Sequence, residues 1–139
     1  MDIVRDAWRN AVRAFGARPA QARGVLAIVS NGADRATVEV TAQRCGWALA
    51  EDGSNVPPVV LYDRAVSPTG WREAVAAWTE HSPRPYVILV SARTDNNLWD
   101  ELQRAGGSDI LRSPLNPEHL SSALSRAWAI WQGQQRLRS

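Results

Sequence analysis

The sequence has no lysine, since all 16 of its basic residues are arginine. No mechanism that uses a lysine ammonium group is therefore open to this chain. Cysteine is scarce as well: Cys45 is the only one, so neither an internal disulfide nor a cysteine-based zinc site can form. No apolar run approaches the roughly 18 residues of a membrane span, and charged residues interrupt the N-terminus where a signal peptide needs an apolar stretch. We therefore expect a cytoplasmic protein with no membrane partner.

An excess of one charge is also missing. The formal net charge is +2 over 139 residues, and the basic residues are spread along the chain. A nucleic-acid footprint needs basic residues gathered on one face or element, so we expect no direct nucleic-acid binding. The hydrophobic share of 45% and the charged share of 22% are ordinary for a globular protein, and this length favours one compact core.

Motifs for enzymatic phosphate or acyl chemistry are missing too. The sequence has no GxxxxGK[ST] loop, no GxGxxG after a strand and no GxSxG elbow. His81 and His119 have no ligand at metal-binding spacing beside them, so we expect both to be solvated. We therefore predict that the chain is not an enzyme.

Apolar periodicity divides the chain into four segments. Residues 1–16 repeat apolar side chains at helical spacing and predict an amphipathic helix, and residues 17–23 contain proline and glycine and predict a linker. Residues 24–132 form one predicted domain. Residues 133–139 fit either a free tail or the start of a helical linker to an output domain.

Within the domain, short apolar runs alternate with helical patterns. The expected strands are Val25–Val29, Trp47–Ala50, Val59–Tyr62, Tyr86–Val90 and Asp109–Leu111, and the expected helices cover residues 34–45, 71–78, 97–105 and 117–131. Strands that are apolar throughout and alternate with helices imply an α/β fold whose parallel sheet is covered on both faces.

Polar residues mark the ends of these elements. Asp34 is predicted to cap the first of these helices, and Gly46 lies just past its end. Asn116 is predicted to cap the last helix, with Pro117 at the first helical position and Glu118 in the first turn.

The residues that follow the strands are the candidates for function, because the crevice of an open α/β sheet lies beyond the carboxyl ends of its strands. Ser30 and Asn31 follow the first strand, Asp63 the third, Ser91 the fourth and Ser113 the fifth.

The segments VLAIVSN, VVLYDR, VILVSAR and AGGSDILRSPLNPEHL together span about residues 24–132. In order and spacing they resemble the response-regulator receiver family of two-component signalling. The resemblance implies a doubly wound, five-stranded parallel sheet of the flavodoxin-like type, with strand order 2-1-3-4-5. The family places a helix between the second and third strands, but only EDGSNVPP is present there, so we predict that this helix is missing or shortened. The N-terminal helix is a candidate to cover apolar surface left exposed there or to contact a dimer partner.

The resemblance also assigns roles to the strand-end residues. In receivers a strand-end aspartate accepts a phosphoryl group from a histidine kinase, and a hydroxyl residue then moves toward the phosphate. Asp63 matches the acceptor and Ser91 matches the hydroxyl switch.

Other positions depart from the family pattern. Ser30 and Asn31 stand where an acidic pair holds Mg²⁺, Ser113 stands where a lysine steadies the phosphate, and Ile110 replaces an aromatic switch residue. Because Mg²⁺ prefers carboxylate oxygen, we expect its binding to be weak or absent and predict no cofactor.

These departures predict a degenerate receiver that acts through protein–protein contact, as a regulatory module fused to or bound by an output protein. In receivers the fourth helix, fifth strand and fifth helix commonly form the partner-binding face, which here includes Trp99, Ile110 and Arg112. Two alternatives stay open: a working phosphoacceptor in which a histidine kinase phosphorylates Asp63, and a dimerisation scaffold.

Overall fold

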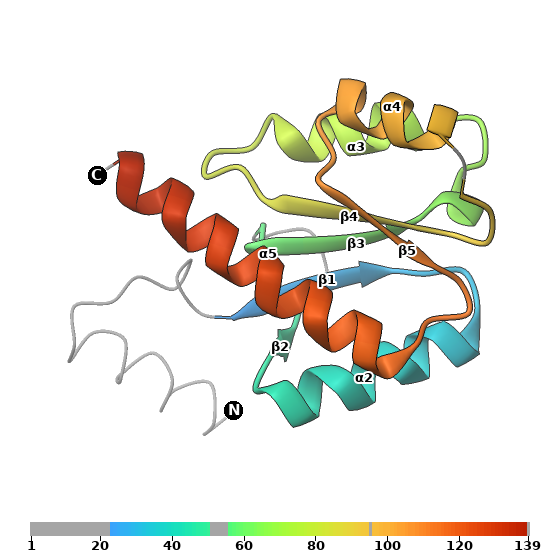
Figure 1. Ribbon diagram of the computed structural model, residues 1–139, viewed down its shortest axis with the longest axis horizontal. Coiled ribbons are helices and arrows are strands. Elements are labelled where there is room, and N and C mark those ends of the chain that lie inside the picture. The colour runs from blue at the N-terminus through green and yellow to red at the C-terminus, as the bar shows by residue number, and fades with distance from the viewer. Residues whose placement is uncertain (1–22, 51–55, 95, 139) are drawn as a thin grey trace, which may run out of the picture.

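The computed structural model describes residues 23–50, 56–94 and 96–138, which form one α/β unit of three layers (Figure 1). A parallel sheet lies in the middle, and helices cover both of its faces. Its elements are β1 (Gly24–Ile28), α2 (Gly32–Cys45), β2 (Ala48–Leu49), β3 (Val59–Asp63), the 3₁₀ turn η2 (Arg64–Val66), α3 (Trp71–Thr79), β4 (Tyr86–Ser91), α4 (Asn96–Ala105), β5 (Asp109–Arg112) and α5 (Pro117–Arg138).

All five strands are parallel and lie in the order β2-β1-β3-β4-β5. Every residue of β3 and β4 is buried, which explains why these central strands read as unbroken apolar runs. The sheet confirms the predicted fold class and the strand order 2-1-3-4-5. At the edge, β2 contributes only two residues, and both are exposed.

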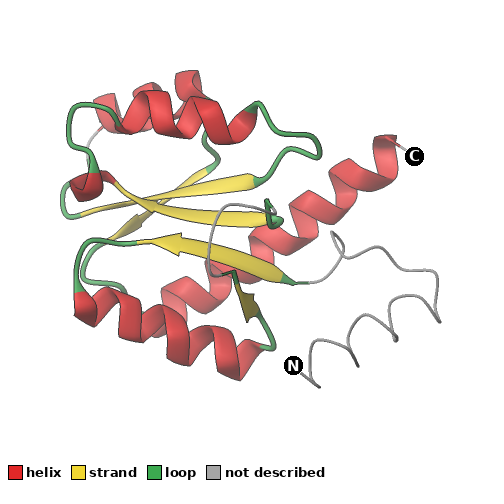
Figure 2. Ribbon diagram, turned by 180° about the vertical axis from the view of Figure 1, so that it is seen from behind, coloured by secondary structure: helices red, strands yellow, loops and turns green. Residues whose placement is uncertain are grey.

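The two faces of the sheet carry separate cores. Helices α2 and α5 cover one face, and α3 and α4 cover the other (Figure 2). Side chains alternate between the faces along each strand, so Leu61 packs toward α2 and α5 while Val60 and Tyr62 pack toward α3 and α4.

The start of α2 differs from the prediction. Asn31, not Asp34, caps the helix, and its side-chain oxygen accepts the backbone N–H of Asp34. Asp34 therefore lies in the first turn and is buried. The end is as predicted: Gly46 adopts a left-handed φ of 74°, which closes the helix at little cost because glycine has no Cβ.

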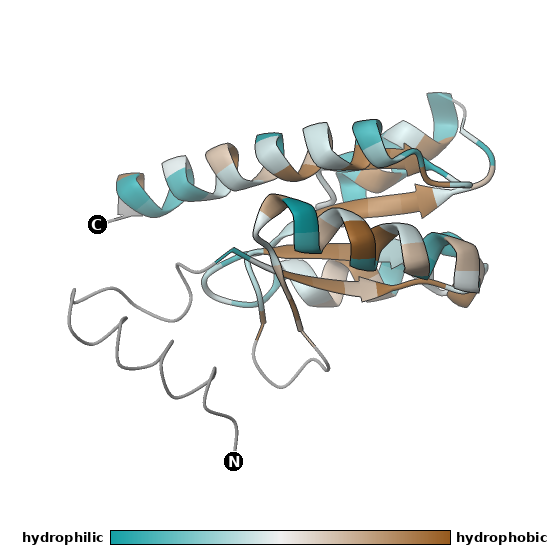
Figure 3. Ribbon diagram, turned by 90° about the horizontal axis from the view of Figure 1, so that it is seen from below, coloured by the Kyte–Doolittle hydropathy of each residue, from teal (hydrophilic) through white to brown (hydrophobic). Residues whose placement is uncertain are grey.

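The last helix begins as predicted. Asn116 accepts the backbone N–H groups of Glu118 and His119. On the inner side of the helix Trp128 is partly exposed, and the buried residues are Leu120, Ala123, Leu124, Ala127 and Trp131. The helix continues to Arg138, through residues assigned to a tail or a helical linker (Figure 3). Its outer side is mostly hydrophilic, while the strands behind it are hydrophobic. The proposed division at residue 132 stays a prediction.

Two predictions concern the N-terminal segment and the connection between β2 and β3. The predicted helix over residues 1–16 and most of the linker over 17–23 lie outside the described residues. Between β2 and β3, residues 50 and 56–58 are not helical, and residues 51–55 lie outside the described part of the chain. Among the described helices, none is long and apolar enough to cross a membrane.

Candidate functional site

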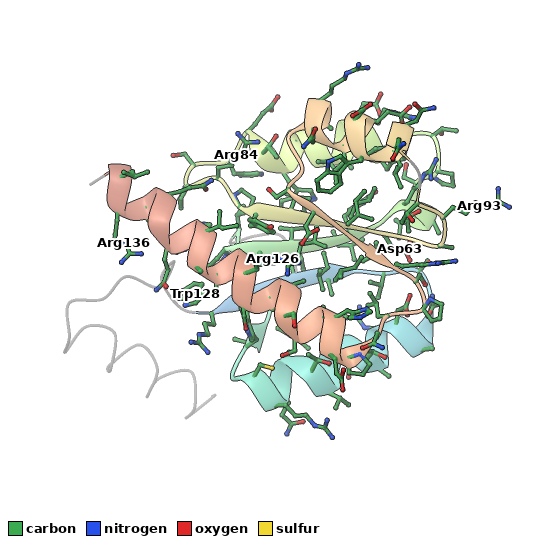
Figure 4. The ribbon with its side chains drawn as sticks, viewed as in Figure 1. Asp63, Arg84, Arg93, Arg126, Trp128 and Arg136 are labelled. Carbon is green, nitrogen blue, oxygen red and sulfur yellow. The ribbon has the colours of Figure 1, made fainter. Side chains whose placement is uncertain are left out.

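The predicted site residues meet at the carboxyl edge of the sheet. Ser30 and Asn31 lie in the β1–α2 loop, Asp63 ends β3, Ser91 ends β4 and Ser113 follows β5. Figure 4 shows Asp63 at the end of its strand, with Arg93 at the same edge and pointing outward. Because the strands are parallel, residues that are far apart in the sequence come together here.

Asp63 is buried, and three donors satisfy its carboxylate. Its Oδ2 accepts the backbone N–H of Ser30 at 3.0 Å and the Ser30 hydroxyl at 2.6 Å, and its Oδ1 accepts the N–H of Ala65 at 2.9 Å. The last bond makes Asp63 the cap of η2. Ser30 thus donates to the aspartate from the place where the family pattern has a metal-binding carboxylate.

Asp34 is a second buried carboxylate at this edge, with only 1% of its surface exposed. Its Oδ2 accepts the Ser113 hydroxyl at 2.5 Å and the Asn31 side-chain amide at 3.0 Å, and its Oδ1 accepts the backbone N–H of Leu115 at 2.8 Å. Burial alone raises the pKa of a carboxyl group, but the hydrogen bonds from Ser113, Leu115 and Asn31 outweigh it and lower the pKa of Asp34. The side chain is therefore a stable buried anion.

This role of Asp34 was not predicted from the sequence, but a signal for it was present. An Asn followed three residues later by an acidic residue resembles a capping box, in which the acidic residue lies in the first turn of the helix. That spacing would have moved the cap to Asn31 and placed Asp34 inside the helix.

Ser91 and Ser113 are joined through the backbone. The N–H of Ser113 donates to the carbonyl of Ser91 at 3.0 Å. The Ser91 hydroxyl donates to the carbonyl of Arg93 at 2.6 Å and accepts the N–H of Arg93 at 3.3 Å. The hydroxyl predicted to act as a switch is therefore engaged within its own loop.

The donor set at this edge does not fit Mg²⁺. A divalent hard cation needs several free carboxylate or carbonyl oxygens. Here Asp63 accepts hydrogen bonds from Ser30 and Ala65, and Asp34 accepts them from Asn31, Ser113 and Leu115. No group of three or more His, Cys, Asp or Glu side chains suited to a metal ion is found among the described residues.

A second candidate site lies beside this edge, over α4, β5 and α5. It is an open hollow of about 640 Å³ lined by Thr94, Asn96, Trp99, Ile110, Leu111, Arg112, His119, Ser122 and Arg126. The three residues predicted for a partner surface, Trp99, Ile110 and Arg112, all line it. Trp99 is 38% exposed and lies outside the buried stripe of α4, which Leu98 and Leu102 form.

Two arginines, Arg112 and Arg126, belong to the polar lining of the hollow. Arg112 is exposed, and Arg126 donates to Asp109 at 2.7 Å, which raises the pKa of Arg126 through that hydrogen bond and the nearby negative charge. The side chain of His119 is also exposed. Figure 4 shows Arg126 projecting from the middle of α5. No carboxylate is among the lining residues within the described part of the chain.

Comparison with known proteins identifies the fold. No protein-family model and no curated protein matches the sequence. The solved structures that resemble this one include response-regulator receiver domains, so the chain has the receiver fold.

Three of these structures show the extent of the likeness. A response regulator from Thermotoga maritima is 15% identical with a TM-score of 0.68, and the match covers 78% of this chain and 98% of that one. The Vibrio cholerae chemotaxis protein CheY4 is 24% identical with a TM-score of 0.66, covering 76% and 98%. A pilus assembly-related protein from Burkholderia pseudomallei is 20% identical with a TM-score of 0.65, covering 81% and 93%.

Proposed function

We propose that this domain is a degenerate receiver that carries information by protein–protein contact, without normal phosphoryl transfer. The observation that carries the proposal is the contact between Ser30 and Asp63. Two donors of Ser30 bind the carboxylate that matches the phosphoacceptor, at 3.0 and 2.6 Å. A neutral hydroxyl thus occupies the place of a group that would hold a metal ion.

The lack of a positive charge at position 113 supports the same proposal. A phosphoaspartate adds nearly two negative charges and needs cationic partners. Ser113, at the position of the family's lysine, instead donates to the Asp34 carboxylate at 2.5 Å. A negative charge therefore stands next to the position that holds a positive one in the family, which disfavours a phosphoryl group at this edge.

The hollow over α4, β5 and α5 is the surface that we propose for the partner. Trp99 and Ile110 offer apolar contacts, and Arg112, His119 and Arg126 offer positive or ionisable ones. This combination favours a protein segment that presents an apolar anchor beside carboxylates. We place the domain in the cytoplasm, as a non-enzymatic module that binds a separate output protein or is fused to one, for example a transcription regulator. A homodimer is a further form that this surface could support.

The phosphoryl-transfer half of the proposal is tested by acetyl phosphate with millimolar Mg²⁺, followed by intact-mass spectrometry. We expect no added phosphoryl group on the wild-type protein, and no Mg²⁺ binding by calorimetry. A response regulator that labels under the same conditions is the positive control. Stoichiometric labelling that Asp63→Asn abolishes would establish a working phosphoacceptor and overturn the proposal.

A further inference from the structure

The buried carboxylate of Asp34 joins two loops that are distant in the sequence. Asp34 belongs to the first turn of α2, and its partners Ser113 and Leu115 lie in the loop between β5 and α5. Ser113 is in turn bonded to the end of β4 through the carbonyl of Ser91. One carboxylate therefore ties together loops that follow three different strands.

The β5–α5 loop sets the position of the hollow's two walls. Ile110 and Arg112 belong to β5, and His119 and Arg126 belong to α5, so the loop that connects these elements lies between the two sets of lining residues. Only Ser113, Pro114, Leu115 and Asn116 separate the strand from the helix. A shift of this short loop would move α5 relative to β5 and change the shape of the hollow.

We propose that Asp34 is a positioning residue for the partner surface: it holds the β5–α5 loop in one arrangement, so that the hollow keeps its shape without a phosphoryl signal. This inference rests on the proposed function, in which the hollow binds the partner. Asp34 itself lies in α2 and is not among the residues that line the hollow, so it acts through Ser113 and Leu115.

The ion pair between β5 and α5 is too weak to do this alone. Arg126 pairs with Asp109, but more than half of the Arg126 side chain is exposed, and exposed ion pairs contribute little. The bonds to Asp34 are buried and one partner is charged, which makes them stronger and more sensitive to loss.

The test is backbone and tryptophan-indole NMR of the whole chain, with amide hydrogen exchange, on Asp34→Asn and Ser113→Ala. In Asp34→Asn we expect the Leu115 amide to exchange at least about tenfold faster, because a hydrogen bond to a charged acceptor is lost. We also expect shift changes at the amides of Arg112 and His119 and at the Trp99 indole. Ser113→Ala should give the same pattern with smaller changes. Ser113→Thr keeps the hydroxyl, so its shifts and exchange rates should resemble those of the wild-type protein.

Asp63→Asn is the matched control, because it alters a buried carboxylate at the same edge that accepts hydrogen bonds from Ser30 and Ala65. Its shift changes should stay near those residues. Changes confined to Asn31, Ser113 and Leu115 in the Asp34 and Ser113 variants would overturn the inference. If Asp34→Asn fails to fold, Ser113→Ala decides, since it keeps the bond from Leu115. Phosphoryl labelling of Asp63 would refute the proposed function while leaving this result unaffected.

Discussion

The two buried aspartates show how a carboxyl side chain can be satisfied by neutral donors alone. Asp63 accepts three hydrogen bonds and Asp34 accepts three, all from hydroxyl, amide or backbone N–H donors. Donors of this kind stabilise a carboxylate in place but add no positive charge with which a second anion could pair. Both carboxylates at this edge of the sheet are therefore satisfied internally, each by three hydrogen bonds.

Replacing Asp34 by Asn should lower the free energy of unfolding by about 1–3 kcal/mol, because an amide cannot satisfy both Ser113 and the N–H of Leu115. Urea denaturation of both proteins measures the difference. Asp100→Asn, at an exposed position in α4, is the matched control and should change stability by less than about 0.5 kcal/mol. Equal stability of the two variants would show that the Asp34 bonds contribute nothing net.

The contribution of Asp34 to the stability of the fold should depend on pH. Since the pKa of Asp34 is lowered in the folded state, its contribution to stability is complete above the ordinary value of 3.8 and is lost as the pH falls through the lowered pKa. We expect the stability difference between wild type and Asp34→Asn to shrink when the pH is taken from 6 to below about 3. Denaturation curves across this range provide the measurement, and a difference that stays constant would contradict the assignment.

At the residue scale, the sequence predicted which side chains gather at the edge but not how they pair. Asp63, Ser30 and Ser113 could be placed because each follows an apolar strand. The bond from Ser113 to Asp34 joins residues 79 positions apart, and no local pattern encodes such a contact. Asp34 was predicted to be a simple cap because capping is the commoner role of an aspartate at the start of a helix.

At the scale of elements, local signals predict helix ends well when the capping residue is unambiguous. Asn116 is such a case, since its side chain accepts two N–H groups of the first turn of α5. Asn116→Ala should lower the free energy of unfolding by about 1 kcal/mol. Thermal or urea unfolding tests this, with Asn97→Ala, exposed in α4, as the control expected to have a smaller effect. Equal effects of the two changes would show that the Asn116 cap does not stabilise α5.

Helix α2 shows why other elements are harder to predict. Its buried side includes Asp34 and Thr41, while Val40 is 49% exposed. Polar residues inside and an apolar residue outside blur the periodicity from which helix faces and ends are inferred. The sheet was simpler to predict, because β3 and β4 are buried on both faces and leave a run of apolar residues.

At the scale of the whole molecule, the core and the proposed partner surface each contain a tryptophan, and the two should respond differently to mutation. Trp71 is fully buried between the sheet and α3, whereas Trp99 is 38% exposed at the hollow. Trp71→Ala should lower the free energy of unfolding by about 3–5 kcal/mol, and Trp99→Ala should lower it by less than about 1 kcal/mol while weakening any self-association through this surface.

Denaturation gives the stability change, and sedimentation equilibrium gives the association constant. A loss of stability for Trp99→Ala as large as that for Trp71→Ala would assign Trp99 to the core. If neither the association constant nor the free energy of unfolding changes, Trp99 does not contribute to a dimer contact.

The bond between the carboxylate of Asp34 and the amide of Leu115 also has a consequence for the order of folding. It spans 81 residues, so closing the chain between them is costly in entropy, and we expect the bond to form late in folding. Removing a contact that forms after the transition state acts mainly on the unfolding rate. Stopped-flow chevron plots of Asp34→Asn should therefore show faster unfolding with a nearly unchanged refolding rate. The hydrogen bonds to Asp34 that shape the partner surface would then also set how long the folded domain persists.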